Sequence, residues 1–375
     1  MRVCIFGGGS VGIHYARAWS KLGAEVRVFD LSKDAIGRFP NIWTERYGST
    51  VPGSVQVASL NEFLESELEF DLVVIGTPPP SHGELARLCL DKKTSKFISI
   101  QKPVCTPDSK DLSNFFRIEE DASTLGVNLI SGYNHRYAAS FREFLSFVDR
   151  QNDRHAAVSI EVNWLESWEG ILRAHPWLDS PSDSYLGHSG LGGGALFEHS
   201  HGLDICLYLW TYLGGLGLNE VAVETMWSGS GSYDVSTVLS GSSSDGRLSF
   251  RVAQNVDTNP AEKSVRITSD GWAAVLDFSS SQDTIHLSSS KEDISKKFSK
   301  NRESDFDSEV SLVKSLIEGD QGLSLESRML LDFARALDTS IFAASALHKE
   351  KSNHEYSQEL LRTWARRVES STRLG

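Results

Sequence analysis

The sequence predicts an α/β protein with a doubly wound parallel sheet in its first part and an α+β domain with a large, mostly antiparallel open sheet behind it. Three observations carry this prediction. Strand and helix patterns alternate over the first 130 residues, a glycine-rich turn joins the first strand to the first helix, and alternating apolar and polar segments fill much of the chain beyond residue 150. Strand–helix alternation indicates a parallel sheet covered by helices. Alternating segments bounded by turn residues indicate antiparallel strands with one solvated face.

Length and composition agree with two domains. The chain has 375 residues, more than one typical core holds, and we expect a boundary between 1–130 and 131–375. The net charge of −13 argues against a nucleic-acid partner or an anionic membrane surface. Apolar runs are too short to span a bilayer, and the start lacks a signal peptide's apolar region. The four cysteines show neither metal spacing nor disulfide density, so we expect reduced core residues in a cytoplasmic protein.

The first domain opens with a short buried strand at 2–6, followed by a helical pattern at 13–23 that Gly23 ends. Between them, Gly7, Gly9 and Gly12 form a G-x-G-x-x-G turn, where a dinucleotide-binding Rossmann domain needs it. One glycine makes the turn, one lets the backbone approach a pyrophosphate, and one lets helix and strand pack closely. The free N–H groups at the helix start then attract the anion.

The second strand, at 24–30, closes on Asp30 at about the spacing expected from the glycine turn. A carboxylate there accepts hydrogen bonds from a ribose 2′-hydroxyl and repels a 2′-phosphate. The sequence therefore predicts NAD as the cofactor. Ser32 and Lys33 follow closely and leave NADP open.

Two later strands end in loops at the edge where such sheets bind ligands. The loop "GTPPPSH" (76–82) has three prolines, which either wall the cofactor or stiffen a strand-to-helix turn. "ISIQKPV" (98–104) sets Lys102 between an apolar strand and a proline, either as a solvated strand-end residue or as a group that binds ribose or a substrate hydroxyl. The predicted cofactor contacts in these turns are Gly7, Gly9, Ser10, Val11, Gly12, Asp30, Thr77, Pro78, His82, Gln101 and Lys102.

The second domain is expected to be a mostly antiparallel sheet backed by helices. "SDG" (269–271) fits a hairpin turn, and helical periodicity returns at 305–319, 325–350 and 358–370. The helix near 325–348 is a candidate to pack back on the first domain. The predicted strands lie at 156–165, 219–229, 234–241, 247–255, 263–278 and 283–289.

Trp164 begins a stretch, up to Gly194, with little periodicity and many aromatic and histidine side chains. Long irregular loops are more often functional than not. Aromatic faces beside polar groups suit a sugar or cyclitol ring, although a lid or a subunit contact would explain the same stretch.

"GGGALFEHSHGLDICLYL" (192–209) contains Glu198, His199, His201 and Asp204, which together would suit a metal-dependent hydrolase or lyase. On one continuous helix, however, Glu198, His201 and Asp204 share a side and His199 points away from His201. The two histidines then cannot easily chelate one ion, so we predict no metal. His201 becomes the candidate proton shuttle, His199 a packing residue, and the glycines a place for close approach of backbone to ligand.

Taken together, the motifs resemble those of the Gfo/Idh/MocA oxidoreductases along nearly the whole chain. The resemblance rests on several spaced motifs in the family's order: "GGGSVG" with Asp30, "VVIGTPPPSH", "QKP", "GYNHRY" (132–137) and "GGGALFEHSHGLD". It implies an N-terminal Rossmann domain, a C-terminal α/β domain for substrate binding, and a nicotinamide cofactor beside a Lys–His pair. It also implies a homo-oligomer, a dimer or tetramer, formed through the open sheet.

The resemblance also implies roles for single residues. Lys102 matches the lysine of the family's E-K-P motif, His201 matches the catalytic histidine, and Gln101 stands where the family has glutamate. Asn134 and Arg136 match the polar positions of the motif after the sixth strand, and Glu198 and Asp204 match the acidic positions around the histidine. With Trp164 from the aromatic stretch, the predicted substrate residues are Asn134, Arg136, Trp164, Glu198 and Asp204.

The predicted function is an NAD(P)-dependent dehydrogenase or reductase that acts on a CH–OH or C=O carbon of a sugar, sugar derivative or cyclitol. His201 would exchange the hydroxyl proton, and Lys102 would stabilise the alkoxide. Two alternatives stay open. One is a reductase of the same fold that acts on a C=O or C=N bond of a nucleotide-linked or acidic sugar, and the other is a non-catalytic protein that senses a dinucleotide.

Overall fold

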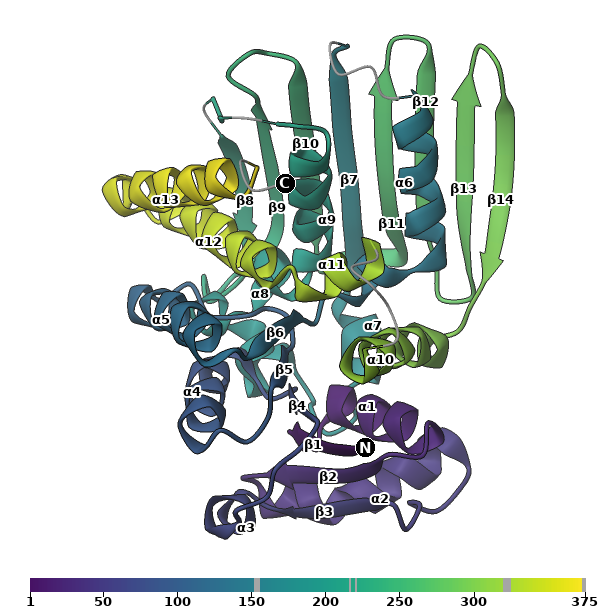
Figure 1. Ribbon diagram of the computed structural model, residues 1–375. Coiled ribbons are helices and arrows are strands. Elements are labelled where there is room, and N and C mark those ends of the chain that lie inside the picture. Colours follow the sequence, from purple (N-terminus) through teal and green to yellow (C-terminus); the bar gives the residue numbers. More distant parts are fainter. Residues whose placement is uncertain (152–155, 216, 220, 320–324, 373–375) are drawn as a thin grey trace. The chain divides into compact units, whose positions relative to one another are not determined.

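The computed structural model describes residues 1–151, 156–215, 217–219, 221–319 and 325–372. Its contacts divide the chain into two compact units, each described here by itself (Figure 1). The N-terminal unit is not continuous in sequence. It comprises Met1–Cys105, Lys110–Asn134 and Glu303–Phe333, and the C-terminal unit comprises Thr106–Ser109, His135–Arg302 and Ala334–Gly375.

The N-terminal unit is built on a six-stranded parallel sheet, in the order β3-β2-β1-β4-β5-β6. The strand order runs outward to β3 on one side and outward to β6 on the other, so it reverses between β1 and β4, which is the usual crevice for a dinucleotide. The predicted parallel sheet is therefore confirmed. Its strands are β1 (Arg2–Phe6), β2 (Glu25–Asp30), β3 (Val55–Ser59), β4 (Leu72–Ile75), β5 (Phe97–Ile100) and β6 (Asn128–Ser131).

Local signals begin and end several helices of this unit. Ser32 accepts a hydrogen bond from the Ala35 N–H at the start of one helix, and Gly48 ends that helix in the left-handed conformation. A capping box between Ser59 and Glu62 begins the next helix. The helices are α1 (Ser10–Lys21), α2 (Lys33–Tyr47), α3 (Leu60–Glu65), α4 (His82–Lys92), α5 (Ser109–Leu125), α10 (Arg302–Glu318) and α11 (Leu325–Leu331).

Helix α10 packs on α1, although some 300 residues of sequence separate them. The Phe306 ring stacks on His14 at 4.8 Å between centroids and meets Tyr15 edge-on at 5.1 Å. Asp307 pairs with Arg17 at 3.2 Å and with Lys21 at 2.6 Å. These contacts make a segment from late in the sequence part of the N-terminal unit.

The C-terminal unit has an eight-stranded sheet, in the order β14-β13-β12-β11-β7-β10-β9-β8. Only β7 and β10 pair in parallel, and the other neighbours are antiparallel, which confirms the predicted large open sheet. The predicted turn joins β11 to β12 with Asp270 and Gly271 between paired Ser269 and Trp272. The strands are β7 (Val158–Ser167), β8 (Ala222–Trp227), β9 (Asp234–Ser242), β10 (Leu248–Asn255), β11 (Asp257–Ser269), β12 (Trp272–Phe278), β13 (Gln282–Ser289) and β14 (Asp293–Ser299).

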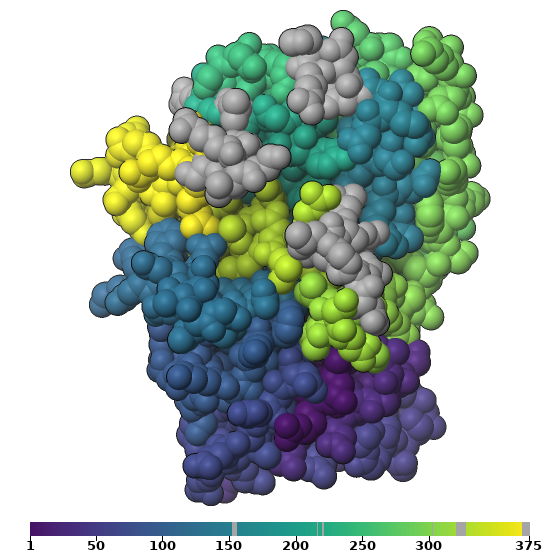
Figure 2. Space-filling model, in the orientation of Figure 1, coloured from purple at the N-terminus to yellow at the C-terminus, as the bar shows by residue number. Residues whose placement is uncertain are grey.

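Helices cover one face of this sheet, and alternate strand residues on that face are buried. α9 packs on β7 and β10, and α6 packs on β12 to β14 (Figure 1). Figure 2 shows the blue surface of α6 beside the green surface of the last strands. The approach of α9 is close, because a Cβ on Gly202 would lie 2.8 Å from the Cβ of Trp164. The helices are α6 (Ala139–Gln151), α7 (Trp168–Arg173), α8 (Gly194–Glu198), α9 (Ser200–Tyr212), α12 (Phe333–Glu350) and α13 (His354–Thr372).

Three local expectations differ from the structure. The stretch after Trp164 contains α7 and short 3-10 turns at Pro181–Asp183, Tyr185–Gly187 and Ser189–Leu191. The helical pattern at 325–350 is divided into α11 and α12. The segment 192–209 is not one helix, because α8 ends at Glu198 and α9 begins at Ser200. No helix among the described residues is long and apolar enough to cross a membrane.

Candidate functional site

The glycine turn of the N-terminal unit has the geometry that a dinucleotide needs. Gly7 has φ +101°, and a Cβ there would lie 2.9 Å from the Gly76 carbonyl oxygen. A Cβ on Gly12 would lie 1.8 Å from the Gly7 oxygen, so α1 can start this close to the end of β1 only with glycine at position 12. Gly9 is the N-cap residue of α1, and no side chain caps the helix there. The N-terminus of α1 therefore fits a pyrophosphate.

Asp30 is fixed beside this turn. Its Oδ2 accepts a hydrogen bond from the Gly8 N–H at 2.7 Å, and its Oδ1 accepts one from the Ser32 N–H at 2.8 Å. The side chain is half-buried. Each carboxylate oxygen retains a further lone pair, so the group can still accept hydrogen bonds from ribose hydroxyls.

His82 is fully buried, unlike a side chain that would touch a cofactor directly. Its Nε2 lies 2.6 Å from the Thr77 carbonyl oxygen, and its Nδ1 lies 3.2 Å from that of Val104. The ring thus ties the proline loop to the loop that carries Lys102. Burial lowers the pKa of His82, whereas the backbone carbonyls raise it. Any effect of His82 on a bound nucleotide is indirect, through Thr77 and the Lys102 loop.

The loop after β5 contains Gln101 and Lys102. Gln101 is buried, and its side-chain amide donates to the hydroxyl of Tyr15 on α1 at 2.8 Å. Lys102 is half-buried and follows directly at the carboxyl end of the strand. The other predicted cofactor residues, Ser10, Val11, Thr77 and Pro78, lie on the first turn of α1 and in the loop after β4.

In the C-terminal unit, His201 belongs to an aromatic cluster at the end of β7. Its ring stacks on Trp164 at 5.6 Å between centroids and meets His135 edge-on at 4.7 Å. His135 and Trp164 also contact the Phe278 ring, at 5.3 and 5.5 Å. The structure therefore brings together two predicted site residues, Trp164 and His201.

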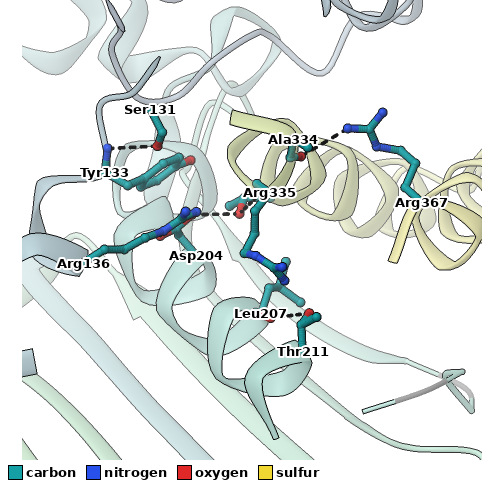
Figure 3. Close-up of polar contacts among 10 residues, drawn as sticks. Ser131, Tyr133, Arg136, Asp204, Leu207, Thr211, Ala334, Arg335 and Arg367 are labelled. Carbon is teal, nitrogen blue, oxygen red and sulfur yellow. Dashed lines mark hydrogen bonds and ion pairs between the residues drawn. The ribbon is translucent and has the colours of Figure 1, made fainter. Parts of the chain in front are cut away.

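Two other predicted substrate residues form a buried ion pair with each other. Arg136 Nε donates to Asp204 Oδ2 at 2.5 Å, and a second guanidinium nitrogen donates to Oδ1 (Figure 3). The Thr339 hydroxyl on α12 donates to the same carboxylate at 3.2 Å. Arg136 and Asp204 are both 0% exposed. Through these hydrogen bonds, Asp204 on α9 links the turn after β6 to α12.

The remaining predicted residues have separate surroundings. Asn134 is half-buried in a 3-10 turn of the N-terminal unit. Glu198 accepts a hydrogen bond from the Tyr185 hydroxyl at 3.3 Å, and burial raises the pKa of that tyrosine. His199 is buried, as expected of a packing residue, with its Nδ1 3.4 Å from Glu166. Glu166 also pairs with Lys263, whose Nζ lies 5.2 Å from the Trp164 ring centroid.

The sheet fixes the break between α8 and α9. Asp234 on β9 accepts a hydrogen bond from the Leu196 N–H at 2.7 Å, and Gln254 on β10 donates to the His199 carbonyl at 2.5 Å. A Cβ on Gly194 would lie 2.1 Å from Asp234 Oδ1. Gly193 and Gly194 thus make room for the chain's own atoms, and the close approach of a ligand to these glycines stays a prediction.

Sequence reasoning missed several neighbours of the candidate residues. His135 lies inside the motif "GYNHRY", between the two residues to which the family resemblance assigns roles. Lys263 alternates with core residues along β11, which marked it as facing the helices. Nothing local indicated Glu166, Tyr15 or Glu309. The described residues contain no group of three His, Cys, Asp or Glu side chains that could hold a metal ion.

All four cysteines are buried, and none forms a disulfide. Burial raises the pKa of the Cys4, Cys89 and Cys206 thiols above the ordinary value. These three thiols therefore do not favour the thiolate that a nucleophile needs.

Comparison with known proteins supports the assignment of the N-terminal part of the chain as a dinucleotide-binding domain. Residues 1–133 match the model of the Gfo/Idh/MocA oxidoreductase family, NAD-binding Rossmann fold. The predicted resemblance is thus confirmed over these residues, as is the prediction of a nicotinamide dinucleotide as cofactor. No curated protein matches the sequence.

Solved structures share the fold along almost the whole chain. UDP-N-acetylglucosamine 3-dehydrogenase GnnA from Acidithiobacillus ferrooxidans has 16% identity and a TM-score of 0.65, over 95% of this chain and 99% of that one. KijD10, a 3-ketoreductase from Actinomadura kijaniata solved with NADP and TDP-benzene, has 14% identity and a TM-score of 0.66, over 91% and 94%. A putative myo-inositol dehydrogenase from Sinorhizobium meliloti 1021 has 16% identity and a TM-score of 0.66, over 93% and 98%.

Proposed function

We propose that this protein is an NAD(P)-dependent oxidoreductase that transfers a hydride between nicotinamide and a CH–OH or C=O carbon of a sugar, sugar derivative or cyclitol. The observation that carries the proposal is the glycine turn with Asp30, in a segment that matches an NAD-binding oxidoreductase family. Gly7 and Gly12 allow the tight packing of the turn that would set the start of α1 beside the pyrophosphate. Asp30 would accept hydrogen bonds from the adenosine ribose, which favours NAD over NADP.

A bound nicotinamide supplies the hydride acceptor or donor, and the protein supplies orientation and a route for the proton. His201 would take the proton of the substrate hydroxyl, because an imidazole can accept or donate a proton near neutral pH. Trp164, stacked on His201, limits the orientations of that ring. Lys102 would stabilise the negative charge that develops on the substrate oxygen. The same residues serve reduction when the steps are reversed.

The proposed substrate class rests on the aromatic cluster and on the similar structures. In this cluster His135 and His201 are half-buried, whereas Trp164 and Phe278 are only 1% and 6% exposed. The two imidazoles are therefore the groups that could contact a sugar or cyclitol ring, and Trp164 would act by holding His201. The name of GnnA refers to a nucleotide-linked sugar, and KijD10 was solved with the nucleotide-linked compound TDP-benzene. Both support a nucleotide-linked sugar as a second candidate substrate. The myo-inositol dehydrogenase supports a free cyclitol.

We also propose that the protein forms a homo-oligomer through the open sheet. Alternate residues on the face opposite α6 and α9 are exposed in the single chain, among them Arg251, Arg266 and His286. Glu161 lies between Arg251 and Arg266 on neighbouring strands, 3.6 Å from Arg251. A second copy could cover this polar row.

The direct test is NAD(H) fluorescence during turnover of a panel of polyols, free sugars and nucleotide sugars, in both directions. Lys102→Ala and His201→Ala should each lower kcat by about 10²-fold or more, in line with the usual contribution of a positioned acid or base. Lys297→Ala, exposed on β14, is the matched control and should turn over normally. Near-normal turnover by either site variant would contradict its role. NAD binding without turnover of any substrate would instead support a sensing protein.

A further inference from the structure

A buried carboxylate on α10 is joined to the residue before Lys102 through one tyrosine. Glu309 is 1% exposed, and its Oε1 accepts a hydrogen bond from the Tyr15 hydroxyl at 2.7 Å. The same hydroxyl accepts a hydrogen bond from Gln101 Nε2 at 2.8 Å. All three residues belong to the N-terminal unit. They form a chain, in the order Gln101, Tyr15, Glu309, in which every donor faces an acceptor.

The direction of this chain follows from its chemistry. A tyrosine hydroxyl has one proton, and Glu309 Oε1 can accept it whether the carboxyl group is ionised or carries its own proton on Oε2. Once Tyr15 donates to Glu309, the partner at position 101 has to be a donor. The amide of Gln101 meets this condition, and a carboxylate at position 101 would not.

Gln101 has little freedom to move away from Tyr15. Its N–H donates to the Ile75 carbonyl at 3.0 Å, which fixes the backbone beside β4. Its side chain lies against β6, where a Cβ on Gly132 would come within 2.7 Å of Gln101 Cδ. A change in the chemistry of this side chain would therefore act on Tyr15, or on the backbone that leads into Lys102.

A second carboxylate close to Glu309 would be unfavourable, because Glu309 is itself buried. Burial raises the pKa of Glu309 to about 8, the hydrogen bond from Tyr15 opposes this, and the charge of Asp305 on the same helix adds to the rise. Glu309 Oε2 has no hydrogen-bond partner among the described residues. The cations Arg17 and Lys21 on α1 are paired with Asp307. A further carboxylate at position 101 would meet Glu309 across one hydroxyl.

We propose that Gln101 and Glu309 are a matched pair joined by Tyr15, and that Glu309 is a positioning residue for Lys102. The pair explains why the position before Lys102 is an amide here and not the glutamate of the E-K-P motif. The acidic group of this network is supplied by Glu309 on α10 instead. The part that concerns Lys102 rests on the proposed function, whereas the pairing of residues 101 and 309 does not.

An exchange of the two groups tests the pair. Gln101→Glu places two carboxyl groups on Tyr15, so at pH 9, above the pKa of about 8 of Glu309, it should lower the thermal unfolding midpoint by a few degrees. It should also weaken NADH binding by about tenfold, a typical coupling for groups in one network. In the double variant Q101E/E309Q, Tyr15 donates to the carboxylate now at position 101 and accepts from the amide now at position 309. This exchange should restore most of both losses.

The comparison between pH values separates positioning from general damage. At pH 6 one proton can be shared between the two carboxylates, so the defect of Q101E should be smaller than at pH 9. Glu318→Gln, exposed near the end of α10, is the matched control and should change neither measurement. If Q101E does not fold, the pair Tyr15→Phe and Glu309→Gln gives an equivalent cycle, because both variants keep the side-chain volume.

Additive effects at pH 9 in either cycle would overturn the proposal, whatever the activity. Restored stability without restored NADH binding would overturn the positioning role. Coupling in both the thermal unfolding midpoint and NADH binding would support the positioning role of Glu309. If the coupling is found but the wild type transfers no hydride to or from any substrate, the proposed function fails and the matched pair stands.

Discussion

At the scale of single residues, burial decides the charge of Glu309 more strongly than its hydrogen bond does. The Tyr15 hydroxyl stabilises the ionised form, yet the loss of water raises the pKa to about 8, against an ordinary value of 4.5. The folded protein therefore keeps a proton on Glu309 over a pH range in which the unfolded chain has released it. Stability depends on pH wherever the two states differ in this way.

We expect the free energy of unfolding to fall as pH rises from about 4.5 to about 8, because the folded state holds the extra proton there. One proton gives a slope of at most about 1.4 kcal/mol per pH unit. Glu309→Gln, which resembles the protonated side chain, should remove this part of the slope and be more stable than the wild type at pH 9. Urea unfolding of the wild type and Glu309→Gln at pH 5, 7 and 9 measures both the slope with pH and the stability at pH 9. Parallel pH dependence in the two proteins would show that Glu309 does not titrate in this range.

At the scale of elements, short polar contacts join helices and turns that lie far apart in the sequence. Asp204 on α9 holds Arg136 in the turn after β6 and Thr339 on α12. Asp234 and Gln254 hold the two sides of the break between α8 and α9. The orientation of α9, which carries His201, therefore depends on residues from four other elements.

Asp204→Ala should lower the free energy of unfolding by about 3–5 kcal/mol, because it leaves the buried Arg136 guanidinium without its carboxylate. The double variant R136M/D204L should recover much of this loss, since it removes both charges and keeps apolar volume. Urea unfolding of the two variants makes the comparison. A double variant no more stable than Asp204→Ala would mean that the lost charge pair is not the cause.

These helices and strands show which features of the structure can be predicted from the sequence and which cannot. Period-two and helical patterns are local, so both sheets and helices such as α1 and α10 could be predicted from neighbouring residues alone. The break at His199 could not, because it depends on Asp234 and Gln254 in strands that follow later. The motifs indicated Arg136 and Asp204, but no spacing shows that two such residues pair with each other. The link from Gln101 through Tyr15 to Glu309 joins three distant segments and has no local signal.

At the scale of the whole molecule, the open sheet presents a row of charged side chains on one face. Arg251, Glu161 and Arg266 lie side by side on β10, β7 and β11. In a single chain such a row is well solvated. A surface that buries it against a second copy would need complementary charges.

Size-exclusion chromatography with light scattering should therefore find a dimer or tetramer whose dissociation constant increases with salt. Arg266→Glu should shift the equilibrium towards the single chain by about tenfold or more, because it sets like charges beside Glu161. Arg117→Ala, exposed on α5 of the N-terminal unit and outside this sheet, is the control. A monomer at all concentrations would contradict the proposed oligomer, and a dimer that Arg266→Glu does not affect would place the contact on another surface.

The return of α10 to α1 has a consequence for synthesis on the ribosome. Residues 1–134 emerge first, but the partner of Tyr15 and the ring that covers His14 emerge only after residue 303. At about 5–20 residues per second, this interval is on the order of ten seconds. During it, the nascent nucleotide-binding sheet has an uncovered α1 face. The unit that begins the chain is thus completed only after residues 303–333 are made, and chaperones have time to bind it.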